Sequence, residues 1–124
     1  MSMKELQDAA VYPVTGLPAV RADVTYAGRW AVVLGTGQTP QADAAGLSQV
    51  ALECRMGYLV LRAPGMLRLD IPLDVIEDDP DVIEERLIDG HMQRVIDEGE
   101  WAAAWLTKLA GEPARLVKFV DTER

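Results

Sequence analysis

The chain has 124 residues, a net charge of −8 and a single cysteine. Its length predicts one domain, residues 1–124, with a hydrophobic core, and its negative charge argues against nucleic-acid binding. No apolar run reaches the roughly 18 residues of a membrane span, the N-terminus lacks the apolar region of a secretory signal, and one cysteine cannot form an internal disulfide. We therefore expect a cytoplasmic protein without membrane contact.

The first part of the chain is predicted to form strands followed by a loop. Apolar and polar residues alternate over residues 20–26, which is the period of a strand with one buried face. Trp30–Leu34 is apolar throughout, and this predicts a strand buried on both faces. Residues 35–46 are rich in Gly, Thr, Gln and Ala, so we expect a loop there, with or without one turn of helix at residues 41–45.

A tight hairpin is predicted in the middle of the chain. Residues 50–55 and Tyr58–Arg62 have the composition of strands, and only Met56-Gly57 separates them. The next four residues, 63–66, carry proline and glycine in the central places of a type II turn. The chain should therefore reverse direction twice between residues 50 and 73.

The alternating pattern returns at residues 67–73 and predicts another strand. Pro72 cannot donate a backbone hydrogen bond, so we expect this strand at a sheet edge or a bulge. Residues 74–85 are acidic and contain a proline, which fits a loop or a short helix. Asp89-Gly90 then predicts a second hairpin, between residues 86–88 and 91–97.

One α-helix is predicted near the C-terminus. Glu100–Ala110 is rich in alanine, and the following Gly111 fits a left-handed helix cap. The apolar stripe of this helix is expected to consist of Trp101, Trp105, Leu106 and Leu109. A closing strand at residues 114–120 completes a mainly β fold of about eight short strands, which we expect to be barrel-like, with a sandwich as the other closed arrangement.

Reactive side chains are scarce. His91 is the only histidine, and Cys54 is the only cysteine. A general base or a metal site needs partner groups, and a reactive thiolate needs a nearby positive charge. We therefore expect His91 at the surface and Cys54 in the core, and we predict neither catalytic residues nor a metal site in this chain.

The acidic residues are concentrated in one segment. Ten of the 20 carboxylates lie between Glu77 and Glu100, where Arg86 and Arg94 are the only basic residues. Such a segment is typical of a solvated surface, and the alternatives are a patch that attracts a basic partner or a divalent cation. The segment lacks the spacing of an EF-hand calcium loop.

Several short motifs, taken in order, resemble the N-terminal β-barrel domain that precedes the MOSC domain in molybdenum-cofactor proteins. The motifs are Tyr12-Pro13-Val14, Gly28-Arg29-Trp30-Ala31-Val32-Val33, Leu61-Arg62-Ala63-Pro64-Gly65-Met66, Ala102-Ala103-Ala104-Trp105-Leu106 and Arg115-Leu116-Val117. The resemblance extends from about Val11 to Lys118. It implies a barrel-like domain without chemistry of its own, because the family's reactive cysteine belongs to the MOSC domain, and it assigns no role to Cys54.

The resemblance suggests which residues could contact a ligand or partner. Arg29 lies beside Trp30, so its guanidinium could stack on that ring or bind an anion. Together with Tyr12 and Arg62, which belong to the same motifs, these residues are the candidate ligand- or partner-binding positions. The alternative for Arg29-Trp30 is a core tryptophan with an arginine at the rim.

The functional prediction is a non-catalytic accessory or binding module that acts through a separately encoded MOSC-domain protein or molybdoenzyme. No cofactor is expected in this chain itself, and any association with the molybdenum cofactor would be indirect. The alternative is an orphan small barrel that binds an unrelated small molecule or serves as an oligomerisation module. An enzyme would have to work with carboxylates alone, which makes it the weakest of the three hypotheses.

Overall fold

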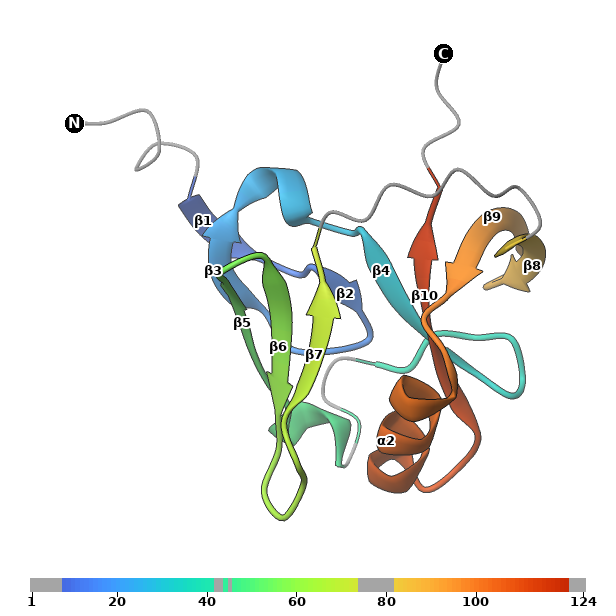
Figure 1. Ribbon diagram of the computed structural model, residues 1–124. Helices are drawn as coiled ribbons and strands as arrows, with labels where there is room; N and C mark the ends of the chain where they lie inside the picture. Colours follow the sequence, from blue (N-terminus) through green and yellow to red (C-terminus); the bar gives the residue numbers. More distant parts are fainter. Residues whose placement is uncertain (1–7, 42–43, 45, 74–81, 121–124) are drawn as a thin grey trace.

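The computed structural model describes residues 8–41, 44, 46–73 and 82–120 (Figure 1). These residues form ten strands in three sheets and one α-helix, so the prediction of a mainly β fold with a C-terminal helix is confirmed. The elements are β1 (Asp8–Val11), β2 (Val14–Thr15), β3 (Val20–Asp23), β4 (Trp30–Leu34), β5 (Ala51–Arg55), β6 (Tyr58–Arg62), β7 (Leu69–Pro72), β8 (Ile83–Ile88), β9 (His91–Asp97), α2 (Glu100–Ala110) and β10 (Ala114–Phe119).

Two sheets and the helix surround the main core. One sheet has the order β2-β4-β10-β9-β8, the second has the order β5-β6-β7, and β1 pairs with β3. The ladders in the described residues form three separate sheets and no closed barrel. Figure 1 shows the β5-β6-β7 sheet facing β4 and β10, with α2 below them. The main core joins all these parts, through side chains such as Leu61, Leu106 and Leu116.

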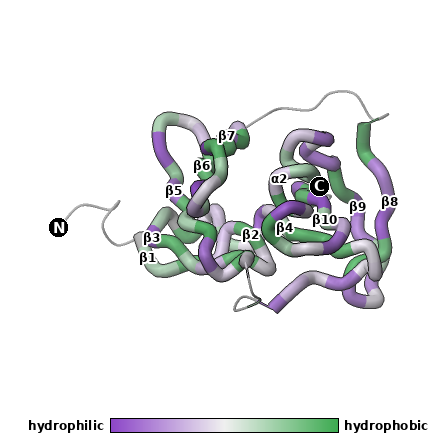
Figure 2. The backbone as a smooth tube through the Cα atoms, turned by 90° about the horizontal axis from the view of Figure 1, so that it is seen from below, coloured by the Kyte–Doolittle hydropathy of each residue, from purple (hydrophilic) through white to green (hydrophobic). Residues whose placement is uncertain are grey.

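Strand β4 is an interior strand of the five-stranded sheet and is buried on both faces, as its apolar sequence predicts. It pairs with β2 on one side and with β10 on the other, and Trp30 to Val33 are buried. Successive side chains of a strand point to opposite faces. Trp30 and Val32 therefore enter the main core, whereas Ala31 and Val33 enter a second, smaller apolar cluster with Val95. Figure 2 shows the hydrophobic character of β4 and β6.

The β8–β9 hairpin folds back onto the loop that follows β4. Asp89 and Gly90 adopt φ angles of 51° and 85°, as the Asp-Gly hairpin predicts. The Asp89 N–H donates to the Gly37 carbonyl at 3.0 Å. The two carboxylate oxygens of Asp89 accept hydrogen bonds from the Thr39 N–H at 2.9 Å and from its hydroxyl at 2.8 Å. These three hydrogen bonds, which we call the clip, tie the tip of the hairpin to the loop after β4.

The two predicted turns of the middle segment are present. Met56 and Gly57 have φ angles of 52° and 85°, which fit a two-residue hairpin. Gly65 has a φ of 76°, and the Met66 N–H donates to the Ala63 carbonyl at 3.1 Å, as in a type II turn. Among the described strands β7 pairs with β6 alone, so Pro72 lies in an edge strand, as predicted.

Three strand boundaries differ from the sequence predictions. β3 ends at Asp23, because Val24–Tyr26 turns into a short 3-10 helix. β7 starts only at Leu69, since the residues before it complete the preceding turn. The acidic segment 74–85 was expected to be a loop or short helix, yet β8 begins at Ile83 and pairs there with β9.

The strand count differs from the prediction, and two predicted loops lie partly outside the described residues. The sequence predicted about eight strands, and it missed β1 and β2, which span four and two residues and are too short to show a period. Residues 74–81 lie outside the described residues. The predicted helical turn at residues 41–45 lies partly outside them; its described part shows the Ala44 N–H donating to the Gln41 carbonyl at 2.9 Å.

The helix occupies the predicted residues, but its buried face is rotated. Ala102, Ala103, Trp105 and Leu106 are buried, and Trp101 is 64% exposed. The small alanines allow α2 to pack closely against β10, which moves Trp101 out of the core. Gly111 caps the helix in the left-handed conformation with a φ of 77°. Among the described residues, no helix is long and apolar enough to span a membrane.

The clip predicts a measurable pKa. The hydrogen bonds from the Thr39 N–H and hydroxyl lower the pKa of Asp89 below its ordinary value. The stabilisation from the clip is therefore present above the unfolded pKa and is lost as pH falls through the folded pKa. In Thr39→Val the hydroxyl donor is removed, so the Asp89 pKa should rise in an NMR titration of its carboxyl carbon.

Thr36→Val, in the same loop, is the matched control and should leave the Asp89 pKa unchanged. An equal Asp89 pKa in the wild type and in Thr39→Val would show that the hydroxyl does not hold the hairpin tip.

Candidate partner-binding groove

Trp30 and Tyr12, two of the predicted site residues, have different roles in the structure. Trp30 is fully buried, its indole N–H donates to Glu98 Oε2 at 2.9 Å, and Lys118 Nζ lies 5.8 Å from the ring centroid. Tyr12 is 54% exposed, and its carbonyl accepts a hydrogen bond from the Gly28 N–H at 2.8 Å. Trp30 therefore fits the alternative of a core tryptophan, and Tyr12 retains an exposed ring.

The two arginines predicted as site residues are both engaged within the protein. Arg29 is half-buried, and its guanidinium carbon lies 5.3 Å from the centroid of the Tyr26 ring. The ring on which Arg29 stacks is therefore that of Tyr26, where the sequence suggested Trp30. Arg62 is exposed and bonds to Glu53 at 2.8 Å, which lowers the pKa of that carboxyl. Arg29 lies close to Tyr12 along the backbone, because the neighbouring Gly28 N–H donates to the Tyr12 carbonyl. Arg62 lies apart from them, on β6 of the β5-β6-β7 sheet.

His91 lies at the surface as predicted, and Cys54, which was expected in the core, lies at its edge. His91 is exposed at the start of β9. Cys54 is partly buried against the main core, and this burial raises the pKa of its thiol, which keeps it protonated and weakly nucleophilic at neutral pH. In the part of the chain that the structure describes, no three His, Cys, Asp or Glu side chains are placed to hold a metal ion.

A network of charges fixes the N-terminal end of helix α2. Asp97 accepts hydrogen bonds from the Gly99 N–H at 2.8 Å and from the Arg115 guanidinium, which also bonds to Glu100 at 2.7 Å. Burial alone would raise the pKa of Asp97, but these hydrogen bonds and the nearby guanidinium charges outweigh it, and its pKa is lowered. The network links β9, α2 and β10, so its role is to hold the helix in place.

An apolar groove lies between helix α2 and the turn that follows β6. Its helical side comes from four residues at the i, i+3, i+4 and i+7 positions of one helix face. Its other side comes from the 63–68 turn, and the groove encloses about 250 Å³. We call it the tryptophan groove. The residues that line it are Gly65, Met66, Leu67, Trp101, Ala104, Trp105 and Lys108.

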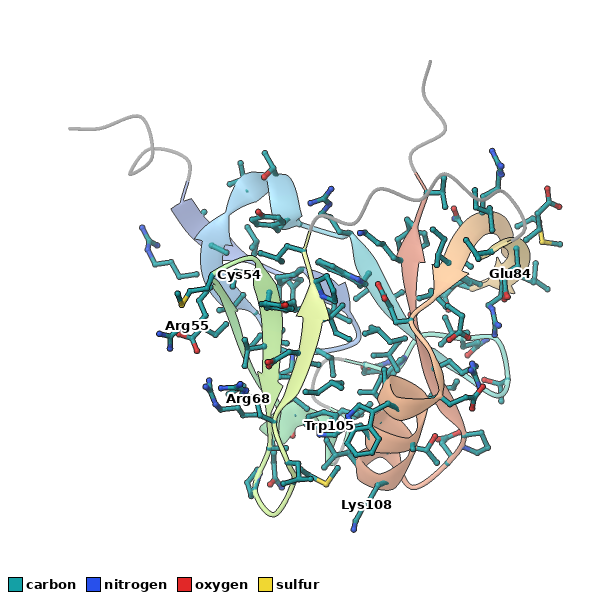
Figure 3. The ribbon with its side chains drawn as sticks, viewed as in Figure 1. Cys54, Arg55, Arg68, Glu84, Trp105 and Lys108 are labelled. Carbon is teal, nitrogen blue, oxygen red and sulfur yellow. The ribbon has the colours of Figure 1, made fainter. Side chains whose placement is uncertain are left out.

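Trp105 joins the two sides of the tryptophan groove. Its side chain is 5% exposed and packs in the main core, while its indole N–H donates to the Leu67 carbonyl at 2.6 Å. A buried indole N–H needs such a partner, because an unpaired one costs free energy. Figure 3 shows Trp105 between the helix and the turn, with Lys108 projecting outward.

The outer part of the groove exposes unusually large apolar side chains. Trp101 and Leu67 are 64% and 74% exposed, and Met66 is half-buried beside them. Among the described residues that line the groove, the one charged side chain is that of Lys108, which is exposed. This combination can bind an apolar or aromatic group in contact with a negative charge.

This groove was not predicted from the sequence. Trp101 was expected on the buried stripe of the helix, because a tryptophan at that spacing resembles a core residue. The signal that could have indicated otherwise is the adjacent pair Ala102-Ala103, since small residues mark the face that packs closely. The apposition of the helix with the 63–68 turn is a tertiary contact that no local pattern predicts.

The comparisons with known proteins give one informative relationship. The chain is similar to a solution structure of a protein from Bordetella bronchiseptica, which was a structural-genomics target. The two share 45% sequence identity over 97% of this chain and 91% of that chain, with a TM-score of 0.76. The chain therefore belongs to the same protein family as this Bordetella protein. No protein-family model matches the chain, and no curated protein matches it.

The hydrogen bond of Trp105 predicts an asymmetry between the two tryptophans. Trp105→Phe removes the indole N–H and leaves unfilled volume, so it should lower the free energy of unfolding by about 1–3 kcal/mol. Trp101→Phe is the matched control, and because Trp101 is largely exposed it should change that free energy by less than about 0.5 kcal/mol. Urea unfolding measures both values. Equal effects would contradict the assigned roles.

Proposed function

We propose that this chain is a non-catalytic accessory module, similar to the N-terminal domain that precedes the MOSC domain, and that it acts in the cytoplasm by binding a separately encoded MOSC-domain protein or molybdoenzyme. The barrel-like character of that domain type is part of the proposal. Its support is the arrangement of the described strands, whose separate sheets pack around one main core.

The observation that carries the proposal is the composition of the tryptophan groove. Two segments on which the family resemblance rests, residues 61–66 and 102–106, supply or adjoin its two sides. Exposed tryptophan and leucine side chains around a concave surface are typical of a protein-binding site. The groove is therefore the surface through which the partner is proposed to bind.

The size of the groove favours a protein partner over a complete cofactor. Its volume of about 250 Å³ lies below the roughly 300–1,000 Å³ typical of sites that enclose a small molecule. One side chain of a partner protein fits such a volume, since interface pockets commonly hold a single anchoring residue. Arg62, which could have bound a phosphate, is already paired with Glu53. Any link to the molybdenum cofactor would thus pass through the partner.

The alternative function is a small barrel that binds an unrelated small molecule or joins copies of itself. The same exposed apolar residues would serve in self-association, because they would be buried between two copies. The two functions differ in what the groove contacts. Partner association and self-association must therefore be measured together.

The proposal predicts the effect of altering the groove on partner binding. A MOSC-domain protein from the same genome should bind the wild type in isothermal titration calorimetry, with the chain itself monomeric by analytical ultracentrifugation. Trp101→Ala should weaken binding by about tenfold or more, as expected for a central aromatic contact. Ala104→Glu should also weaken it, because the new side chain would fill the groove.

Met92→Ala is the matched control for these variants. Met92 is 62% exposed but lies on β9, outside the groove, so its loss should leave partner binding unchanged. The proposal is wrong if no MOSC-domain protein from that genome binds at high micromolar concentration. It is also wrong if Trp101→Ala instead abolishes a dimer of the chain.

A further inference from the structure

We infer that the tryptophan groove receives an aromatic side chain of the partner protein and that a carboxylate of the same partner segment pairs with Lys108. This inference rests on the proposed function, because it assumes that the groove binds a protein partner. It adds the chemistry of the segment that the groove selects.

The aromatic preference follows from the groove lining. Trp101 offers a largely exposed indole, whereas Trp105 is already fixed by its bond to the Leu67 carbonyl and gives a rigid inner wall. Aromatic rings associate favourably in offset or edge-to-face arrangements, and a methionine sulfur beside a ring adds to the contact. Met66 supplies that sulfur. An aromatic side chain therefore gains more from this lining than an aliphatic one of equal size.

The carboxylate preference follows from charge. The whole chain carries a net charge of −8, yet the charged residue in the groove lining is a lysine. Among the described residues, no carboxylate forms an ion pair with Lys108, so its ammonium group is available to a partner. Neighbouring Arg68 is 57% exposed and pairs with Asp70 at 3.0 Å. The groove is thus a locally positive site on an acidic protein, and an acidic group is the complementary one.

The geometry of the helix sets the spacing that the partner must match. Trp101 and Lys108 are separated by seven residues, which is about two helical turns or 10 Å along one face. One residue of the partner and its near neighbours can therefore supply both groups. The aromatic ring would lie against Trp101 and Trp105, and the carboxylate would lie at Lys108. A partner segment that carries an aromatic residue next to Asp, Glu or a chain terminus has this chemistry.

Two small probes test the inference without the partner. N-acetyl-phenylalanine carries an aromatic ring and a carboxylate, and N-acetyl-phenylalaninamide carries the same ring without the charge. In ¹H-¹⁵N NMR titrations of the full chain, both should shift the indole N–H of Trp101 and the amides of residues 65–67. The charged probe should bind roughly two- to fivefold more tightly, as expected for an exposed ion pair.

Two variants assign the two contacts. Lys108→Gln should remove the difference between the probes, and Trp101→Ala should weaken both, whereas Met92→Ala should change neither. Each of these positions is exposed, so the variants should retain the wild-type dispersion of amide signals. The inference is overturned if the neutral probe binds as tightly as the charged one to the wild type, or if neither probe shifts the groove signals. If the probes fail in this way but Trp101→Ala still weakens binding of the partner protein, the proposed function stands and only this inference is wrong. Failure of the inference and failure of the proposed function are therefore distinguishable.

Discussion

The hydrogen bond from the Trp105 indole to the Leu67 carbonyl, at 2.6 Å, is the contact on which the arrangement of this molecule depends. In the described residues the β5-β6-β7 sheet shares no strand pairing with the five-stranded sheet, so side-chain packing and side-chain hydrogen bonds hold the two together. Trp105 does this at the core, since its ring is buried among both sheets and its polar atom reaches the turn after β6. The groove follows from this contact, because the turn and the helix are fixed against each other.

The N-terminal end of the helix is fixed by a different interaction. Asp97 bonds to the backbone before the helix and to Arg115 on β10, so α2 is held by charge at its start and by the indole of Trp105 in its middle. A surface fixed in this way loses little conformational entropy when a partner binds. This way of holding the helix, together with the exposed Trp101, supports the partner binding that we propose for the helix face.

Local features of the fold were predictable from the sequence, and tertiary ones were not. Asp89-Gly90 and Met56-Gly57 specify their turns through the backbone angles they permit, and Gly111 ends the helix for the same reason. The direction in which Trp101 points depends on how closely Ala102 and Ala103 allow α2 to approach β10. A periodic pattern of apolar residues gives no information about that distance. Among the candidate site residues, Trp30 is buried and Arg62 is paired, and none of the four predicted positions lines the tryptophan groove.

The central proposal is that this chain binds a protein partner through the tryptophan groove. Amide hydrogen exchange of the chain, measured by mass spectrometry with and without the MOSC-domain protein, tests it most directly because it maps the bound surface without any substitution. The account predicts that protection on binding is concentrated in residues 63–68 and 101–108. Protection concentrated in the β8–β9 hairpin, with the groove segments unchanged, would contradict it.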